Sequence, residues 1–210
     1  RKSRGLGDVY KRQRSYLESD PHRFLEGALI ASYFINAQKV YIYMRDEYPT
    51  VIKILLDEIN KMEDEEIIPK DFFIVRRGAG AYICGEESAM IESIEGKRGL
   101  PRHRPPYVAE IGLFGCPTLT NNLETLFWVR DIIEKGAEWF AEKGSNGNKG
   151  FHSFSVSGRV KNPGVKVAPA GITIQQLIDD YCDGMADGHT FKGYLPGGAS
   201  GGILPAAMND

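Results

Sequence analysis

Apolar residues follow helical and strand spacing in turn along the first half of the chain. Helical spacing predicts helices over residues 20–36, 51–59 and 86–95, and β-branched or aromatic runs predict strands over 40–44 and 72–75. The first helix is expected to bury a broad face made of Phe24, Leu25, Ala28, Leu29, Ala31 and Ile35. Helix, strand, helix, strand, helix in this order implies right-handed parallel crossovers. The pattern therefore predicts part of a doubly wound parallel α/β sheet.

The pattern changes in the second half of the chain. Asn121, with Glu124 three positions later, is expected to form a capping box that opens a helix running to about Lys135. Residues 144–150 are rich in glycine and asparagine, which indicates a flexible linker and the best domain boundary.

A hairpin, a helix and a returning strand are predicted after this linker. The strands fall at 154–158, around Val165 and Val167, and at 191–195, and Thr173 caps the helix. We therefore expect an α/β domain over residues 15–145 and a small α+β module over 150–210.

The composition is ordinary for a soluble globular protein, with 42% hydrophobic and 26% charged residues. No apolar run approaches the roughly 18 residues that cross a bilayer, so direct membrane insertion is not expected. The three cysteines, Cys84, Cys116 and Cys182, are widely spaced and never form a Cys-x-x-Cys pair. They indicate a reducing compartment, the cytoplasm, and argue against a metal site within this segment.

Charge is distributed unevenly along the chain. The first fourteen residues hold six of the 26 lysines and arginines and one of the 28 acids, so the rest of the chain carries a net charge of −7. This leader has no apolar stretch and is not a secretory signal. We expect a non-native junction at the broken end of a longer gene, and a disordered tail or a targeting peptide are the alternatives.

Residues 97–117 combine four prolines with five basic or potentially basic side chains. Proline blocks regular structure and such dense charge stays exposed, so an extended surface loop is expected. A basic loop with an aromatic residue can bind nucleic acid, but the acidic net charge outside the leader favours a small anionic ligand.

The candidate chemistry lies between the second strand and the third helix. Gly78, Gly80 and Gly85 permit positive φ angles and a close approach of backbone to ligand, and the following helix presents unpaired N–H groups. The spacing matches neither the Rossmann fingerprint nor a P-loop. Glu86 and Glu87 open the helix, where they would repel phosphate and favour ribose hydroxyls or amides. The alternative is that they only complement the helix dipole.

Four motifs in order resemble the flavin-bearing, NADH-oxidising subunit of respiratory complex I and its relatives in NAD-dependent formate dehydrogenases and bidirectional hydrogenases. They lie at residues 77–89, 95–99, 101–107 and 121–126, within a resemblance that covers about 17–205. It implies a partial, Rossmann-like doubly wound domain that binds FMN and NADH, followed by a ubiquitin-like β-grasp module.

The resemblance also implies an activity. A hydride passes between NAD(H) and bound FMN, and electrons then leave singly to iron–sulfur clusters in a multisubunit dehydrogenase, one partner being a [2Fe–2S] subunit. The location implied is cytoplasmic, in the peripheral arm if the parent is complex I. The competing hypothesis is a non-catalytic scaffold or electron-transfer adaptor that kept the fold and lost the flavin.

Site residues follow from the matching positions. Glu87 corresponds to the catalytic position at the nicotinamide end. Tyr107 departs from the family's phenylalanine but keeps a stacking face. The expected cofactor-binding residues are Gly78, Gly80, Tyr82, Gly85, Glu86, Glu87, Arg104, Tyr107, Asn121, Asn122 and Thr125.

Two further departures affect the cofactors. The family's first glycine-rich flavin loop is expected before Leu17, and the cysteine motif for its [4Fe–4S] cluster after Asp210. We therefore expect this sequence to be a middle segment of the subunit, and we expect the segment to be inactive by itself. Residues 92–95 and 196–205 favour the formate dehydrogenase branch.

Overall fold

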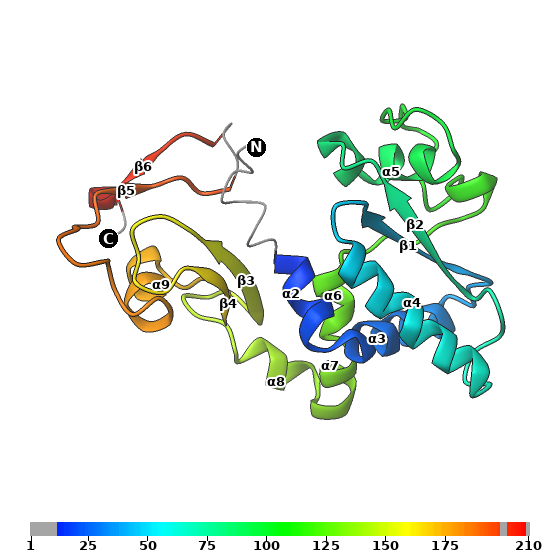
Figure 1. The fold of residues 1–210 in the computed structure, drawn as a ribbon, viewed down its shortest axis with the longest axis horizontal. Helices are drawn as coiled ribbons and strands as arrows, with labels where there is room; N and C mark the ends of the chain where they lie inside the picture. Colours follow the sequence, from blue (N-terminus) through cyan, green and yellow to red (C-terminus); the bar gives the residue numbers. More distant parts are fainter. Residues whose placement is uncertain (1–11, 198–200, 209–210) are drawn as a thin grey trace. The chain divides into compact units, whose positions relative to one another are not determined.

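The computed structural model describes residues 12–197 and 201–208. Their contacts divide the chain into two compact units, one made of Tyr16–Arg130 and one that holds the described residues from Asp131 on (Figure 1). Residues 1–11 of the predicted basic leader, and residues 198–200 of the segment that favoured the formate dehydrogenase branch, lie outside the described residues. Residues 12–14 of the leader open the first described helix.

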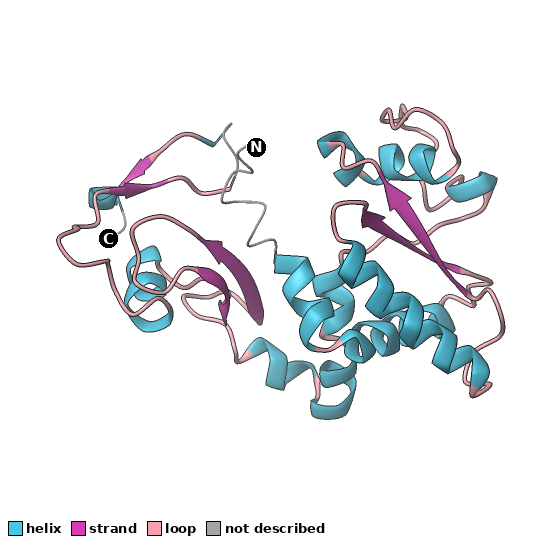
Figure 2. Ribbon diagram, in the orientation of Figure 1, coloured by secondary structure: helices cyan, strands magenta, loops and turns pink. Residues whose placement is uncertain are grey.

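The first unit is a mixed α/β fold (Figure 2). Its elements are α2 (Arg12–Ser19, of which the end lies in this unit), α3 (Pro21–Phe34), β1 (Val40–Arg45), α4 (Pro49–Asp64), β2 (Phe73–Gly78), the 3-10 turn η1 (Tyr82–Gly85), α5 (Glu87–Ile94), the 3-10 turn η2 (Leu113–Gly115) and α6 (Leu123–Phe127).

The predicted parallel sheet is confirmed. β1 pairs with β2 in parallel, from Val40 opposite Phe73 to Arg45 opposite Gly78, and α4 forms the crossover between them. Among the described residues this sheet has two strands. Figure 1 shows α5 beyond the arrowhead of β2, so the glycine turn lies at the carboxyl end of the strands, where ligands bind in such sheets.

Helix α3 begins where the sequence predicts. The Asp20 carboxylate accepts a hydrogen bond from the backbone N–H of Arg23, and Pro21 occupies the first turn. The expected apolar face does not extend to the end of the helix. Tyr33 and Phe34, whose rings contact each other, are 83% and 75% exposed, and Ile35 at the C-cap is also exposed.

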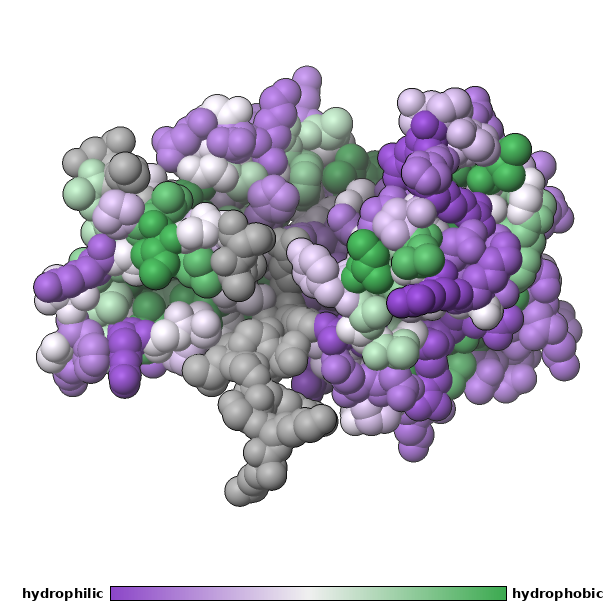
Figure 3. All heavy atoms as spheres, turned by 90° about the horizontal axis from the view of Figure 1, so that it is seen from above, coloured by the Kyte–Doolittle hydropathy of each residue, from purple (hydrophilic) through white to green (hydrophobic). Residues whose placement is uncertain are grey.

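The core of this unit forms where α2, α3, α4, α6 and the two strands meet. Its buried members are Tyr16, Leu17, Phe24, Leu25, Ala28, Ile42, Met44, Val51, Ile52, Leu55, Ile59, Ile68, Phe73 and Phe127. In Figure 3, which looks down on the side of this unit that carries α5 and its loops, hydrophilic residues dominate and hydrophobic ones form small groups. The side that carries the candidate site is therefore a polar surface.

The predicted helix over residues 122–135 is two helices. α6 ends at Phe127, Trp128 is its C-cap, and α7 (Val129–Lys135) follows. Asn122 occupies the N-cap, but no side chain caps this end, so the predicted capping box is wrong. The helix begins one residue later than expected, so Glu124 is its second residue, and a capping box needs the glutamate at the third. The Glu124 carboxylate accepts a hydrogen bond from the Tyr16 hydroxyl at 3.3 Å.

Helix α6 packs closely against α3 at Gly27. A Cβ atom built on Gly27 would lie 1.9 Å from the carbonyl oxygen of Leu126 and 2.8 Å from its carbonyl carbon. The backbones of the two helices therefore approach at a distance that only glycine permits.

The second unit contains α8 (Ala137–Ala141), β3 (Phe151–Val156), β4 (Gly164–Pro169), α9 (Ile174–Tyr181), β5 (Gly193–Tyr194), β6 (Leu204–Pro205) and the 3-10 turn η4 (Ala206–Met208). β3 and β4 form the predicted antiparallel hairpin, and Thr173 forms a capping box with Gln176 at the start of α9. Val160, Ile178 and Cys182 form its buried cluster.

Residues 144–150 are not a free linker in the structure. The Ser145 N–H donates to the carbonyl of Ala170 at 2.8 Å, and the Asn146 side chain donates to the carbonyl of Gly171 at 2.9 Å. These bonds fasten the segment to the end of the hairpin, within the second unit. None of the described helices has both the length and the apolar character that a bilayer span requires.

Candidate functional site

The three glycines of the turn have different roles. Gly78 ends β2, and a Cβ there would lie 2.2 Å from the hydroxyl oxygen of Tyr43. Of the three glycines that permit a positive φ, Gly80 alone has one, 81°. A Cβ on Gly85 would meet no atom within 4 Å, which leaves the face of this residue open to a ligand.

Glu86 and Glu87 open helix α5 after the 3-10 turn η1. Glu86 is the N-cap, and its Oε2 accepts hydrogen bonds from the Ser88 hydroxyl at 2.6 Å and the Ala89 N–H at 2.9 Å. The hydrogen bond from Ser88 is the main reason that the pKa of the Glu86 carboxyl lies below its ordinary value. The capping role predicted as the alternative is therefore present.

Arg104 binds both carboxylates, which capping does not explain. Its Nη2 lies 2.7 Å from Oε1 of Glu86 and 2.6 Å from Oε1 of Glu87. Oε2 of Glu87 accepts a hydrogen bond from the Thr120 hydroxyl at 2.9 Å. The proline-rich loop and the start of α5 thus form one cluster of charges, each side chain being between a third and two fifths exposed.

Arg102 attaches the same proline-rich loop to helix α5. Its guanidinium bonds Glu92 at 2.6 Å and Glu95 at 3.1 Å and donates to the carbonyl of Gly112 at 3.1 Å. Its backbone N–H donates to the Ser88 hydroxyl at 2.8 Å. These bonds fix the loop on which Arg104 stands.

Replacing Arg102 by alanine is expected to lower the free energy of unfolding by about 2 kcal/mol, because hydrogen bonds to charged groups contribute ~1.5–3 kcal/mol each. Glu92 and Glu95 would keep their ion pairs with Lys97, so only part of their stabilisation is lost. Burial acts to raise the pKa of Glu95, but hydrogen bonds from Lys97, the Phe114 N–H and Arg102 outweigh it and the pKa is lowered.

A lowered folded-state pKa stabilises the fold above the ordinary glutamate pKa of about 4.3 and ceases to do so as the pH falls through the folded value. Urea denaturation between pH 7 and pH 3 measures both effects. Arg102→Ala should lose stability at pH 7 and show a shallower acid decline, and an unchanged acid decline would contradict this account of Glu95.

The other predicted site residues are aromatic rings and amides on the elements that carry this cluster or adjoin it. The side chains of Tyr82 and Tyr107 are exposed, that of Tyr82 by 98%. Asn121 and Asn122 directly follow Thr120, so its bond to Glu87 brings the start of α6 to the glutamate pair. Within the described part of the chain, the side chains of Asn121, Asn122 and Thr125 make no hydrogen bond, so their polar groups are available to a ligand.

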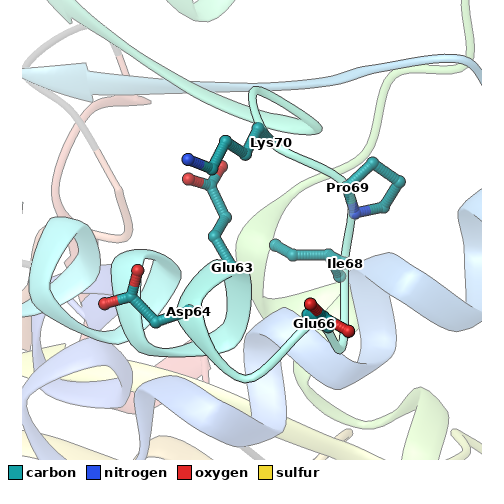
Figure 4. A pocket seen from close by; sticks show the side chains of 6 residues that line it. All are labelled: Glu63, Asp64, Glu66, Ile68, Pro69 and Lys70. Atoms are coloured by element: carbon teal, nitrogen blue, oxygen red, sulfur yellow. The ribbon is translucent and has the colours of Figure 1, made fainter.

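Hollows on the surface of this unit include one beside the charge cluster and one at the end of α4. One of about 400 Å³ is lined by Tyr82, Ile83, Gly85 and Glu86 and adjoins the charge cluster. A larger one of about 590 Å³ lies at the end of α4, where Figure 4 shows Glu63 and Lys70 pointing toward one another. The larger hollow contains none of the predicted site residues. In the described residues no three histidine, cysteine or acidic side chains are grouped so as to hold a metal ion.

Residues 9–131 match the family model described as the Nuo51 FMN-binding domain. The match covers more than half of the chain and includes the motifs at the glycine turn, the basic loop and α6. The chain belongs to this family. The predicted family resemblance is thereby confirmed.

Relatives of this family member include the NADH-quinone oxidoreductase F subunit of Rickettsia typhi, 40% identical over 94% of this chain and 49% of that protein. The corresponding protein of Mycobacterium tuberculosis is 42% identical over 88% of this chain and 43% of that one. A solved NAD⁺-reducing [NiFe]-hydrogenase, air-oxidised, superposes with a TM-score of 0.83 at 36% identity, over 93% of this chain and 33% of that one. The chain spans about half the length of the curated relatives it matches.

The residues of this Nuo51-type domain fit an FMN group. A flavin phosphate and ribityl chain need hydrogen-bond partners, and the side chains of Asn121, Asn122 and Thr125 are unengaged. An isoalloxazine ring needs an open face, and the space that a Cβ on Gly85 would fill is unoccupied, which fits such a ring.

Three residues of the site were not predicted from the sequence. Ser88 and Thr120 orient the two glutamates, and Arg102, expected only as one of the basic residues of the exposed loop, holds that loop in place. The motif positions gave no signal for Thr120, because its partner lies 33 positions away. Ser88, two residues after an N-cap glutamate, could have been found by its helix position.

Proposed function

We propose that this chain forms the part of an NADH-oxidising flavoprotein subunit that holds the nicotinamide nucleotide against FMN. The observation that carries the proposal is the bridge from Arg104 to Glu86 and Glu87 beside the exposed Tyr82 ring and the open Gly85. These residues lie within one family domain whose relatives include NADH-quinone oxidoreductase and NAD⁺-reducing hydrogenase proteins.

Each group has a task in this proposal. FMN, when bound, accepts a hydride from NADH and releases electrons one at a time. Glu87 contacts the nicotinamide end, and Glu86 hydrogen-bonds ribose hydroxyls or amide groups that its carboxylate favours over phosphate. Asn121, Asn122 and Thr125 bind the flavin phosphate and ribityl chain, while Gly78 and Gly80 shape the turn. Tyr82 and Tyr107 offer ring faces for stacking.

The parent assembly and the second unit are also proposals. We propose partner subunits that include a [2Fe–2S] protein, a [4Fe–4S] cluster in the full-length subunit, and a cytoplasmic location. The proposed parent assembly is complex I, an NAD-dependent formate dehydrogenase or a hydrogenase. The genes next to the gene for this chain distinguish these three assemblies. The antiparallel hairpin β3–β4 with α9 supports a β-grasp module.

The test is NADH-dependent dye reduction by the holoenzyme that contains this chain, together with its flavin content. A stoichiometric FMN and activity with NADH are expected. A holoenzyme in which this subunit holds no flavin would overturn the proposal and favour the non-catalytic scaffold.

Replacing Arg104 by alanine is expected to raise the Michaelis constant for NADH about fivefold while turnover changes less, because a partly exposed loop cation binds ground and transition states alike. The effect should shrink with added salt, since exposed charges are screened over roughly 10 Å at 0.1 M ionic strength. Steady-state kinetics at two salt concentrations measure this. Collapse of turnover at saturating NADH would instead indicate a catalytic role for Arg104.

A further inference from the structure

The two glutamates at the start of α5 are held in the same way. Each has Oε1 on Nη2 of Arg104, at 2.7 Å for Glu86 and 2.6 Å for Glu87. Each has Oε2 on a hydroxyl, that of Ser88 for Glu86 at 2.6 Å and that of Thr120 for Glu87 at 2.9 Å. A carboxylate with both oxygens engaged has a single preferred orientation.

The two hydroxyls differ in origin. Ser88 follows Glu86 by two positions on the same helix, is buried, and belongs to the cap of α5. Thr120 lies 33 positions from Glu87, is half-buried, and immediately precedes the asparagine pair at the start of α6. Its bond therefore joins the two helix starts, α5 and α6, that the proposed site uses for different parts of its ligands.

The two partners of Glu87 also differ in how firmly they are held. Arg104 stands on the proline-rich loop with 40% of its side chain exposed, and its positive charge is available to an incoming anionic nucleotide. Thr120 is fixed beside α6, whose backbone is packed on Gly27. A nucleotide that paired with Arg104 in place of Glu87 would leave the Thr120 hydroxyl as the donor to Glu87 among the described residues.

We propose that Thr120 is a positioning residue for Glu87: its hydroxyl holds one carboxylate oxygen so that the other faces the nicotinamide nucleotide. This rests on the proposed function, in which Glu87 contacts that nucleotide. A β-branched threonine suits the task because its χ1 angle is restricted and its hydroxyl is correspondingly well placed.

The experiment compares Thr120→Val and Thr120→Ser in the holoenzyme, with NADH and an artificial electron acceptor. Valine keeps the shape and removes the hydroxyl, so the Michaelis constant for NADH should rise about fivefold with turnover within about twofold, the size expected for the net contribution of one ordinary hydrogen bond. Serine keeps the hydroxyl, so with Thr120→Ser the Michaelis constant for NADH should stay within about twofold of that of the unsubstituted enzyme.

A double-mutant cycle shows whether the hydroxyl acts through Glu87. In a Glu87→Ala background, Thr120→Val should change the Michaelis constant no further, because its partner is already absent. The control is Thr173→Val, which removes the capping hydroxyl of α9 in the second unit. It should lower the melting temperature without changing the Michaelis constant, and so exclude general destabilisation as the cause.

The outcomes separate the two proposals. If Glu87→Ala raises the Michaelis constant and Thr120→Val does not, the proposed nucleotide site stands and the positioning role is wrong. If Thr120→Val still raises the Michaelis constant about fivefold in the Glu87→Ala background, the positioning role is also wrong. If Glu87→Ala leaves the constant unchanged, the nucleotide site itself is wrong, and the positioning role falls with it.

Discussion

Replacing Gly27 by alanine is expected to destabilise the chain by about 3 kcal/mol, at the upper end of what overpacking a well-packed interior costs. The new Cβ would lie 1.9 Å from the carbonyl oxygen of Leu126. Backbone cannot rotate away as a side chain can, so α6 must move off α3. The displaced helix carries Asn121 and Asn122 at its start, and flavin retention should fall together with stability.

Urea denaturation of the 210-residue chain measures the stability change, and flavin content of the holoenzyme measures the second effect. The matched control is Gly85→Ala, because the Cβ there meets nothing within 4 Å and the residue does not have a positive φ. It should change the free energy of unfolding by less than about 0.5 kcal/mol. Equal destabilisation by the two variants would show that the α3–α6 contact is not the cause.

Replacing Glu87 by glutamine is expected to lower kcat/KM for NADH by about 10–100-fold, which corresponds to the ~1.5–3 kcal/mol of a charged hydrogen bond in the proposed nucleotide contact. Glutamine keeps the length and an acceptor oxygen but removes the charge that Arg104 binds. The protein should stay folded, because an exposed carboxylate in the first turn of a helix contributes only ~0.3–1 kcal/mol.

Two measurements on the same preparation separate the two roles of Glu87, in the nucleotide contact and at the helix start. They are the kinetics with an artificial acceptor and a melting curve. Reduced kcat/KM at nearly constant melting temperature supports the proposed nucleotide contact. Unchanged kinetics with a lower melting temperature would leave only the contribution of Glu87 to the helix start.

Much of the first unit could be predicted from local spacing. The start of α3 follows from the Asp20-Pro21 pair, and the parallel pairing of β1 with β2 follows from the order of the elements. The helix start depends on residues close together in the sequence, and the parallel pairing depends on the order of strand, helix and strand, so propensity and periodicity report both.

The sequence could not show what depends on distant partners. Glu124 has the spacing of a capping box with Asn121, but the helix begins one residue later, and the Glu124 carboxylate accepts a hydrogen bond from Tyr16, 108 positions away. Residues 144–150 have the composition of a linker, but the carbonyls of Ala170 and Gly171 fasten them. The same limit hid Thr120, whereas Arg104 and the two glutamates were found because family motifs mark them.

The bridge from Arg104 to Glu86 and Glu87 constrains how this site can change during evolution. Loss of either carboxylate frees the guanidinium, and loss of Arg104 leaves two like charges side by side at the start of one helix. A single substitution at position 86, 87 or 104 therefore costs more free energy than a paired substitution that changes Arg104 together with one of the glutamates. Across homologous sequences, a change of charge at position 104 should be accompanied by a change at position 86 or 87.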